Sequence, residues 1–375
     1  MPHQSVIALD LGATKVACVV ANDGALLGAG VAAYPAPRAS WPDDAQVIGQ
    51  AVERALEAAG SAGGRGRVVV AVSHPELSHA RVTASIDLSS DEPVPVRAHD
   101  VSRLRQHALS QALGIDREAL LLEPLSYRGS GFDQVRDPRT LLTTRLSGTF
   151  ALVSVPLALR QRITQGVEAA GLDVDRLVYG AQALAVSCAA PDTAERLLLV
   201  DIGGCSTECV LLECGHLLRS LTVPWGGMHA VEAIASRCRT TRDQALALSL
   251  QGGSSPKAAV ASVWQAQMFA LAAGLRQVLF GEPLPSRALV TGRGALVDGM
   301  VEWVQEATGI PATLARSSRS THLNDIGQQL ALSTAFGIVD LVAHQAPAVP
   351  SISRRSAGLV HRLLARTQFV LTEYF

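Results

Sequence analysis

Two apolar runs separated by a glycine-bearing polar turn open the chain. Val6 to Leu9 and Val16 to Val20 each have the length of a buried strand, so this pattern predicts a hairpin. Ala45 to Ala59 repeats apolar residues at three- and four-residue spacings, the period of an amphipathic helix. A Gly/Ser-rich loop then leads to Val68 to Val72, another buried strand. Strands and helices in this order are typical of an α/β fold.

The pattern changes between about residue 80 and residue 160. Ala80 to Ile86 predicts a strand and Val101 to Leu113 predicts a helix. Two further strand candidates, Ala119 to Leu125 and Leu141 to Val155, are separated by a polar turn region around Asp137. This mixture predicts a small α+β module inserted into the first half of the chain.

Regular elements resume after this module. Leu157 to Ala170 predicts a helix that stops at a glycine, and Leu197 to Val200 predicts a strand. Cys209 to Leu221 has the pattern of a second hairpin, and Ala258 to Leu279 that of a long helix.

One sequence motif occurs twice, about 190 residues apart. Ala8 to Thr14 reads ALDLGAT and Leu199 to Thr207 reads LVDIGGCST: an apolar strand, an aspartate, a glycine turn and a hydroxyl residue. Glycines let backbone N–H groups approach phosphate oxygens, and an aspartate can hold a magnesium-bound water. A third segment, Ala288 to Leu296, has a strand, a glycine turn and a helix, and is suited to lie against an adenosine. We therefore expect two similar lobes around one nucleotide cleft.

Composition and charge exclude several classes of protein. The 375 residues are 48% hydrophobic and 17% charged with a net charge of −1, which excludes extensive disorder. A sequence pI of 6.8 argues against nucleic acid as a partner. Of the 32 basic residues only Lys15 and Lys257 are lysines. The six cysteines form no CxxC pair and the histidines have no metal-ligand spacing, so we expect core or surface roles in a reducing cytosol.

The three motifs, in this order, resemble the actin-like ATPase superfamily, and the sequence is most similar to the FtsA family of bacterial cell-division proteins. Leu120 to Asp133, followed by Asp137-Pro138 and Arg145-Leu146, resembles the inserted subdomain of that family, and Val223 to Gly227 also fits its pattern. The resemblance implies a two-lobed, ribonuclease-H-type α/β fold with an FtsA-type inserted α+β subdomain and a C-terminal amphipathic helix. The implied division is a first lobe at 1–80 and 160–195, an insert at 81–159, a second lobe with a reduced outer part at 196–343, a linker at 344–353 and a helix at 354–375.

The resemblance also implies ATP or ADP with Mg²⁺ as cofactors. Asp10 and Asp201 would be the catalytic carboxylates and would hold Mg²⁺ through water, and Lys15 would lie near the terminal phosphates. The other implied cofactor-binding residues are Gly12, Thr14, Gly203, Gly204, Ser206, Thr207, Gly226, Gly227, Gly292 and Gly294.

Several positions depart from the family pattern. Cys205 replaces a glycine in the second phosphate loop, where a left-handed backbone would cost roughly 1 kcal/mol. Glu208 replaces an aspartate, and Leu246 and Ser249 replace a glutamate and a lysine that contact the ribose in the family. Losing those two partners weakens nucleotide affinity on the order of a hundredfold. We therefore expect at most a weak ATPase.

A deletion affects the expected partners. After Gly252-Gly253 the chain enters a helix almost at once, where relatives insert the small sheet that receives the tail of the tubulin-like protein FtsZ. The resemblance implies an FtsZ-like tubulin homologue or other divisome proteins as partners, and self-association into filaments, but the FtsZ contact itself does not carry over.

The tail predicts an amphipathic helix after a proline-bearing linker. One face is apolar and the other basic, and terminal aromatics suit a lipid interface. A helix packed on the body or on a partner protein is the alternative. The membrane-binding residues would be Leu359, Arg362, Leu363, Leu364, Arg366, Val370, Leu371, Tyr374 and Phe375. With no signal peptide, this predicts a cytoplasmic protein held on anionic lipids at the inner face of the cell membrane.

Two alternatives use the same fold. The segment Leu9 to Lys15 is similar to the start of bacterial hexokinase-type proteins, although no sugar-binding aspartate segment or zinc site is evident. A PilM-like pilus-assembly adaptor also lacks the outer sheet, whereas the region around Asp137 and the amphipathic tail count against it.

Overall fold

The first lobe is built on a five-stranded sheet. In this computed structural model, which describes residues 5–35, 37, 39–60, 66–189, 195–250 and 257–343, the predicted opening hairpin forms between β1 and β2. β1 also pairs in parallel with β4, so the hairpin edge is antiparallel and the other edge parallel. The sheet order is β11-β4-β1-β2-β3, with β1 at Ser5–Leu11, β2 at Lys15–Asn22, β3 at Ala25–Ala33, β4 at Arg67–Val72 and β11 at Val174–Tyr179.

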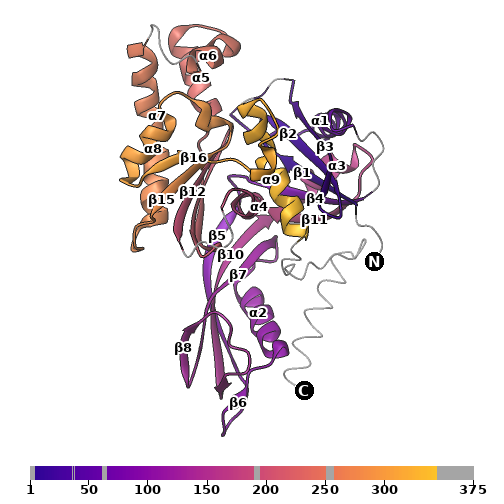
Figure 1. Cartoon of the computed structure of the whole chain (residues 1–375), viewed down its shortest axis with the longest axis vertical. Helices are drawn as coiled ribbons and strands as arrows, with labels where there is room; N and C mark the ends of the chain where they lie inside the picture. The colour runs from indigo at the N-terminus through magenta and orange to yellow at the C-terminus, as the bar shows by residue number, and fades with distance from the viewer. Residues whose placement is uncertain are drawn as a thin grey trace.

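Helices cover both faces of this sheet (Figure 1). Alternating strand residues such as Ile7 and Leu9 face α1 (Ala45–Ala58) and α3 (Leu157–Glu168), whereas Val6 and Ala8 face the other side. Because every second side chain of a strand points to the same face, one apolar run supplies both cores. The predicted helix at 45–59 is confirmed within one residue, and α3 ends just before Gly171, whose φ is +74°.

The helix that ends the described chain packs on the first lobe. α9 (Ile326–Ala343) lies against α4 (Gly180–Cys188), and its Phe336 joins the core cluster of Val6 and Ala8. The domain division predicted from sequence assigns α9 to the second lobe, whereas in the structure α9 packs on the sheet of the first lobe. Within the described residues α9 alone has the length and apolarity to cross a membrane, and most of it is buried as a core helix.

The inserted module has its own sheet, which projects beneath the two lobes (Figure 1). Its strands run in the order β5-β10-β7-β8, and α2 packs against β5 and β10. Between the two predicted strands the structure adds β8, because the chain turns at Ser130-Gly131, before Asp137. The bounds are β5 Ser78–Asp87, β6 Val94–Pro95, α2 Ala98–Ala112, β7 Arg117–Gly129, β8 Phe132–Val135, β9 Leu142–Thr143 and β10 Arg145–Pro156.

The second lobe repeats the sheet of the first. Its order, β14-β13-β12-β15-β16, has the same sequence of antiparallel and parallel pairings as β3-β2-β1-β4-β11. This confirms the predicted two-lobed α/β fold. The strands are β12 Arg196–Ile202, β13 Thr207–Glu213, β14 His216–Val223, β15 Arg287–Thr291 and β16 Ala312–Leu314.

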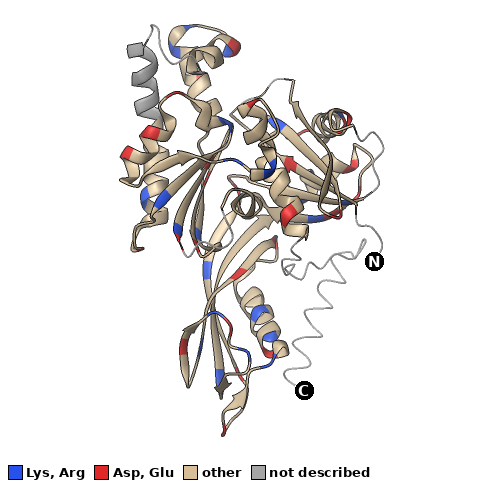
Figure 2. Cartoon of the chain, viewed as in Figure 1, with Lys and Arg blue, Asp and Glu red and all other residues tan. Residues whose placement is uncertain are grey.

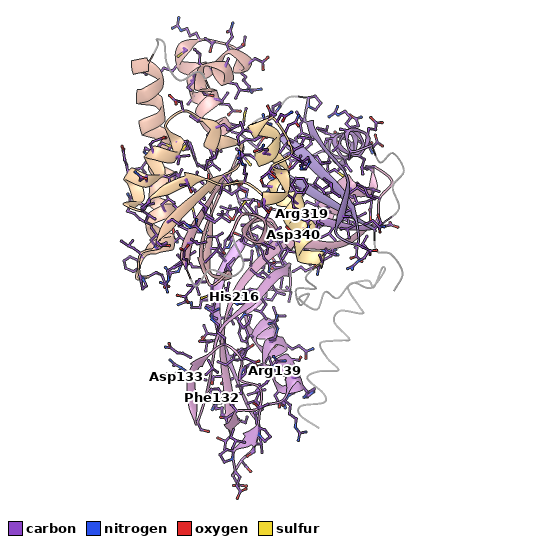
Figure 3. All side chains as sticks on the ribbon, in the orientation of Figure 1. Phe132, Asp133, Arg139, His216, Arg319 and Asp340 are labelled. Carbon is purple, nitrogen blue, oxygen red and sulfur yellow. The ribbon has the colours of Figure 1, made fainter. Side chains whose placement is uncertain are left out.

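The outer part of the second lobe is helical where it is described. Between α5 and α7 the described residues contain one helix, α6, and no strand. The helical elements of this lobe are α5 Gly227–Cys238, α6 Arg242–Leu250, α7 Lys257–Leu279, the 3₁₀ turn η1 Arg293–Leu296 and α8 Met300–Thr308. A second 3₁₀ turn, η2 Ser318–Ser320, precedes α9. Arg319 Nε of η2 donates to Asp340 Oδ1 of α9 at 2.7 Å (Figure 3). The linker at 344–353 and the tail at 354–375 lie outside the described residues.

Polar side-chain contacts join the second lobe to the module. His216, at the start of β14, lies 2.7 Å from Glu123 of β7, and Figure 3 shows it at the junction between the two parts. Arg136, just after β8, contacts Glu213 of β13 at 3.2 Å. The hairpin of β13 and β14 therefore rests on the module, and β7 of the module also contacts β11 of the first lobe. The base of the module thus has contacts with both lobes.

Candidate functional site

The repeated motifs meet across a small cavity between the lobes. The loop after β1 (residues 10–15, the first phosphate loop) and the loop after β12 (residues 201–208, the second phosphate loop) both border it, as do the glycine turn after β15 and α9. Its volume is about 70 Å³. The residues that border it are Asp10, Leu11, Gly12, Ala13, Thr14, Lys15, Trp41, Ser73, Asp201, Gly203, Gly204, Cys205, Ser206, Glu208, Gly292, Arg293, Leu330 and Thr334.

The first phosphate loop carries an ion pair. Lys15 Nζ donates to Asp10 Oδ2 at 2.6 Å, and both side chains are mostly buried. The Gly12 N–H donates to the Lys15 carbonyl at 2.9 Å, which closes the turn. Burial, with a smaller contribution from the Asp10 carboxylate, raises the pKa of Tyr34, so the phenol stays neutral. Lys15 is thus the cation of this loop, and its charge is balanced by Asp10.

The second phosphate loop places carboxyl groups where water is scarce. Removal from water and, to a smaller extent, the nearby Asp10 charge raise the pKa of Asp201 to about 7, although Lys15 acts in the opposite direction. Glu208 is buried, and burial raises its pKa to about 8. The Gly203 N–H donates to the Ser206 carbonyl at 3.0 Å, as Gly12 does in the first loop. Near pH 7 this loop therefore holds a neutral glutamic acid beside a partly protonated aspartic acid.

Glu208 belongs to a polar network that joins three parts of the molecule. Tyr179 Oη, at the end of β11, donates to Glu208 Oε2 at 2.7 Å, and Thr222 Oγ1 of β14 donates to the same carboxyl at 3.0 Å. His79 of β5 contacts Thr222 Oγ1 at 2.8 Å and Ser220 Oγ at 2.7 Å. Burial lowers the pKa of His79 to about 4, so the ring is neutral. The network connects the first lobe, the second lobe and the base of the module beside the cavity.

Cys205 corrects one expectation from sequence. Its φ is not among the positive values found for non-glycine residues, which occur at Asp23, Gln134, Thr140, Cys214 and Arg239. The expected left-handed strain at this position is therefore wrong, because the loop turns without it. The cysteine is buried and belongs to the same apolar core as Ile7 and Leu9.

Four of the predicted cofactor-binding residues lie behind the loops and do not border the cavity. The Gly227 N–H donates to the Gly203 carbonyl at 2.9 Å, and a Cβ on Gly226 would lie 2.6 Å from that same oxygen. Thr207 is fully buried and donates to the Trp225 carbonyl at 2.8 Å. Gly294 packs on Ile202. These residues support the second phosphate loop.

The third glycine turn requires its first glycine. Gly292 has a φ of +78°, and a Cβ there would lie 2.3 Å from Asp201 Oδ1 and 2.5 Å from the Ile202 carbonyl oxygen. A side chain would collide with the second phosphate loop. Arg293, which follows this glycine, borders the cavity, whereas Leu246 and Ser249 do not.

The two phosphate loops touch each other. A Cβ on Gly204 would lie 2.5 Å from Thr14 Cγ2, so the loops are in van der Waals contact. Ligand pockets for molecules of nucleotide size have volumes of about 300 Å³ or more. The donor set fits a Mg²⁺-nucleotide, with an ammonium, hydroxyls, turn N–H groups and two neighbouring carboxylates. The space fits it only after the loops separate.

Sequence reasoning missed several residues at this site. Tyr34 is buried, its hydroxyl has no hydrogen-bond partner among the described residues, and its N–H donates to the Thr14 carbonyl at 3.1 Å. Tyr34 lies beside the first phosphate loop and does not line the cavity, whereas Trp41 borders it, as do Leu330 and Thr334 of α9. No local signal marks these positions, because they reach the cavity through packing between distant segments. Within the described chain, no group of three or more His, Cys, Asp or Glu could hold a metal ion directly.

Comparison with known proteins gives relatives along most of the chain. No protein-family model matches it. Cell division protein FtsA of Pseudomonas aeruginosa is 24% identical over 368 residues, which cover 89% of this chain and 88% of that protein. FtsA of Escherichia coli K12 is 22% identical and covers 89% of each.

The fold is also similar to solved structures. The PilM–PilN type IV pilus biogenesis complex matches with a TM-score of 0.64 and 18% identity, over 91% of this chain and 99% of that chain. MreB5 of Spiroplasma citri bound to AMPPNP matches with a TM-score of 0.51 and 12% identity, over 90% and 96%. At these identities the structures show a shared actin-like fold.

Proposed function

We propose that this chain, a divergent member of the FtsA family of bacterial cell-division proteins, is a scaffold that binds nucleotide weakly and links a cytoskeletal assembly to the membrane. The matches support an actin-like cell-division protein. The observation that carries the scaffold role is the combination of two actin-like lobes with an inserted α+β module that contacts both of them, the second lobe through β14 and the first through β11. Filament formation by self-association is part of this proposal.

ATP or ADP would bind between the phosphate loops. Lys15 would interact with the terminal phosphates, the turn N–H groups and the hydroxyls of Thr14 and Ser206 would bind phosphate oxygens, and the loop at Gly292 would face the adenosine. Mg²⁺ would neutralise phosphate charge and bind through water to Asp10 and Asp201. A nearby cation favours the ionised carboxylate, so bound Mg²⁺ would lower the raised pKa of Asp201. Separating Thr14 from Gly204 costs free energy, which is one reason for weak binding.

Turnover would be slow at most. A general base must be ionised to take a proton from water, and Glu208 is largely protonated at neutral pH because its pKa is about 8. Its carboxyl also accepts hydrogen bonds from Tyr179 and Thr222, so its role is to hold the lobes together. The nucleotide would then control the separation of the lobes more than it would serve as a substrate.

The tail would attach the scaffold to the inner face of the cell membrane. Residues 354–375 would lie in the headgroup region of anionic lipids with Leu363 and Leu364 inward and Arg362 and Arg366 outward. Co-sedimentation with vesicles of mixed anionic and neutral lipid tests this directly. We expect the full chain to sediment, and we expect a chain that ends at Gln345, or the Leu363→Glu/Leu364→Glu variant, to stay in solution.

Two controls separate binding through the tail from nonspecific binding to vesicles and from a general effect of added negative charge. Purely neutral vesicles should bind the full chain far less, because each arginine near an anionic leaflet contributes roughly 1 kcal/mol. The double variant Leu246→Glu/Ala247→Glu adds the same two negative charges at exposed positions on α6 and should bind like the wild type. Equal sedimentation of the full and shortened chains would refute the anchoring role.

The partner would be an FtsZ-like tubulin homologue or another divisome protein. Because the described part of the second lobe has a single helix between α5 and α7, the contact would use helical surface there. Pelleting of the protein with FtsZ polymers from the same organism tests the first choice.

A PilM-like pilus adaptor is the second candidate, because the PilM chain matches over 99% of its length. Fluorescent fusion protein at the division site would favour the division role, and fusion protein at pilus assemblies would favour the adaptor. Nucleotide-dependent phosphorylation of a hexose would favour a sugar kinase over both.

A further inference from the structure

A groove of about 610 Å³ lies between the inserted module and the second lobe. It shares no lining residue with the cavity between the phosphate loops. One wall comes from β5 and β10 of the module, and the other from β14 and the C-terminal end of α7. Its volume is in the range of sites that bind a peptide segment or a small molecule. The proposal that follows does not depend on nucleotide binding.

Both walls contain an edge strand. β5 is the outermost strand of the module sheet, and β14 is the outermost strand of the second-lobe sheet. Alternate residues of an edge strand turn unpaired N–H and C=O groups outward, which makes the edge a template for another strand. The two edges approach each other where His79 bridges to Ser220 and Thr222. Among the described residues no backbone hydrogen bond joins Ala80 or Arg81 to β14.

Apolar side chains line part of the groove. Leu152 of β10 is buried, and Leu221 of β14 is partly buried. Phe280 follows α7 directly and leaves 80% of its surface exposed. A large aromatic side chain at the rim of a groove is a frequent anchor for a protein partner. The groove can therefore accommodate apolar side chains of an added strand.

The charge at the groove is positive. Arg81, Arg219 and Arg276 line it, and no acidic residue does. Glu282 forms ion pairs with Arg81 at 3.7 Å and with Arg219 at 3.6 Å, and Arg219 Nη1 also donates to the Phe280 carbonyl at 2.7 Å. Arg276, in the last turn of α7, has no ion pair within the described chain. Figure 2 shows a basic segment on β5 where it passes the lower end of the second sheet. A carboxylate would gain charge-assisted hydrogen bonds here.

We propose that this groove binds an extended segment of a partner protein, which adds as a strand to the edge of β5 or β14 and places an acidic side chain among Arg81, Arg219 and Arg276. Alternate residues of the segment would be apolar and would contact Leu221 and Phe280. The groove lies on the junction that joins the module to the second lobe, so a bound segment would contact both.

Charge argues against the chain's own tail as the occupant. Residues 354–375 contain four arginines and one glutamate, so they carry the same sign as the groove. Like charges brought together out of water are unfavourable. An acidic segment from another protein complements the groove, whereas this tail does not.

Selection of random linear peptides displayed on phage, with the full chain immobilised, tests the proposal. We expect the selected peptides to carry Asp or Glu between apolar residues. Fluorescence anisotropy should show that Arg276→Glu weakens their binding about tenfold or more, because one charge-assisted contact is lost and a repulsion gained. The matched control is Arg237→Glu, since Arg237 is also exposed in the last turn of a helix, α5, and does not line the groove.

The peptide itself provides a second test that leaves the protein unchanged. Methylation of alternate backbone nitrogens should abolish binding in one alternation and spare it in the other, because an added strand pairs through every second residue. The proposal is overturned if no peptide is enriched, if Arg276→Glu binds the selected peptides as well as wild type, or if backbone methylation has no effect. Displacement of the selected peptide by synthetic residues 354–375 would replace the partner segment with the chain's own tail.

Discussion

The two phosphate loops have the same turn but opposite electrostatic character. In the first loop Asp10 is paired with Lys15 at 2.6 Å, so a full charge is balanced locally. In the second loop the cation is missing, and the pKa of Asp201 rises to about 7 and that of Glu208 to about 8. Equivalent positions of a repeated fold have thus diverged into a charged half and a nearly neutral half. The repeat therefore determines the backbone turn but not the protonation state of its side chains.

The largest effect should come from breaking the ion pair of the first loop. Lys15→Met keeps most of the side-chain volume but leaves Asp10 charged, mostly buried and unpaired. Breaking a buried pair in this way costs about 4 kcal/mol of unfolding free energy, measured by urea denaturation. The double variant Asp10→Asn/Lys15→Met removes the stranded charge and should recover most of the loss. A double variant no more stable than the single one would contradict this account.

The next effect concerns the support beneath the loops. Gly226→Ala places a Cβ 2.6 Å from backbone atoms of Gly203 and Gly204, and should destabilise the protein by about 2 kcal/mol. Gly12→Ala meets the Lys15 carbonyl at 3.3 Å and should cost less than about 1 kcal/mol. Thermal unfolding of both variants compares the two halves. Equal losses would show that the second loop is packed no more tightly than the first.

The neutral half should be visible as a pH dependence. Glu208 has a raised pKa, so the folded protein keeps a proton that the unfolded chain loses above about pH 4.5. Its contribution to stability is therefore full below pH 4.5 and is lost as the pH rises toward 8, with a slope of at most about 1.4 kcal/mol per pH unit. Urea denaturation of wild type and Glu208→Gln between pH 5 and pH 8 should show curves that diverge, the variant losing less with rising pH. Parallel curves would mean that Glu208 is ionised in the fold.

A small effect is expected at Cys205, the position where the family has a glycine. Cys205 has no left-handed backbone to relieve, so Cys205→Gly should not stabilise the protein. Added freedom of the unfolded chain and lost burial should destabilise it by about 1 kcal/mol. A higher melting temperature for Cys205→Gly would show that Cys205 does carry the backbone strain expected from the sequence.

Local pattern predicts much of this fold, and packing determines the rest. The hairpin at β1 and β2 and the helix at 45–59 follow from apolar spacing alone. The docking of α9 on the first sheet does not, because its apolar surface is compatible with either lobe. The strand β8 is not predicted from sequence, because Asp137 and Pro138 indicate a turn more strongly than Phe132 to Val135 indicate a strand.

At the candidate site, too, local sequence patterns predict some features and packing between distant segments determines the others. The two aspartates, the glycine turns and Lys15 could be recognised from their spacing, and the structure brings them to one cavity. The contact between Thr14 and Gly204, the position of Tyr34 and the network around Glu208 depend on how the lobes meet, which no local pattern records. The family comparison also transferred a backbone strain to Cys205 that this loop does not have.

Titration of the full chain with a fluorescent ATP analogue, with and without Mg²⁺, determines whether this protein binds nucleotide. We expect weak, Mg²⁺-dependent binding by the wild type, and binding at least about tenfold weaker for Asp201→Asn, which keeps the shape of the side chain and removes its charge. The matched control Asp243→Asn, at an exposed position on α6, should bind like wild type. No binding by the wild type at millimolar analogue, or equal affinity for wild type and Asp201→Asn, would contradict a nucleotide-binding scaffold.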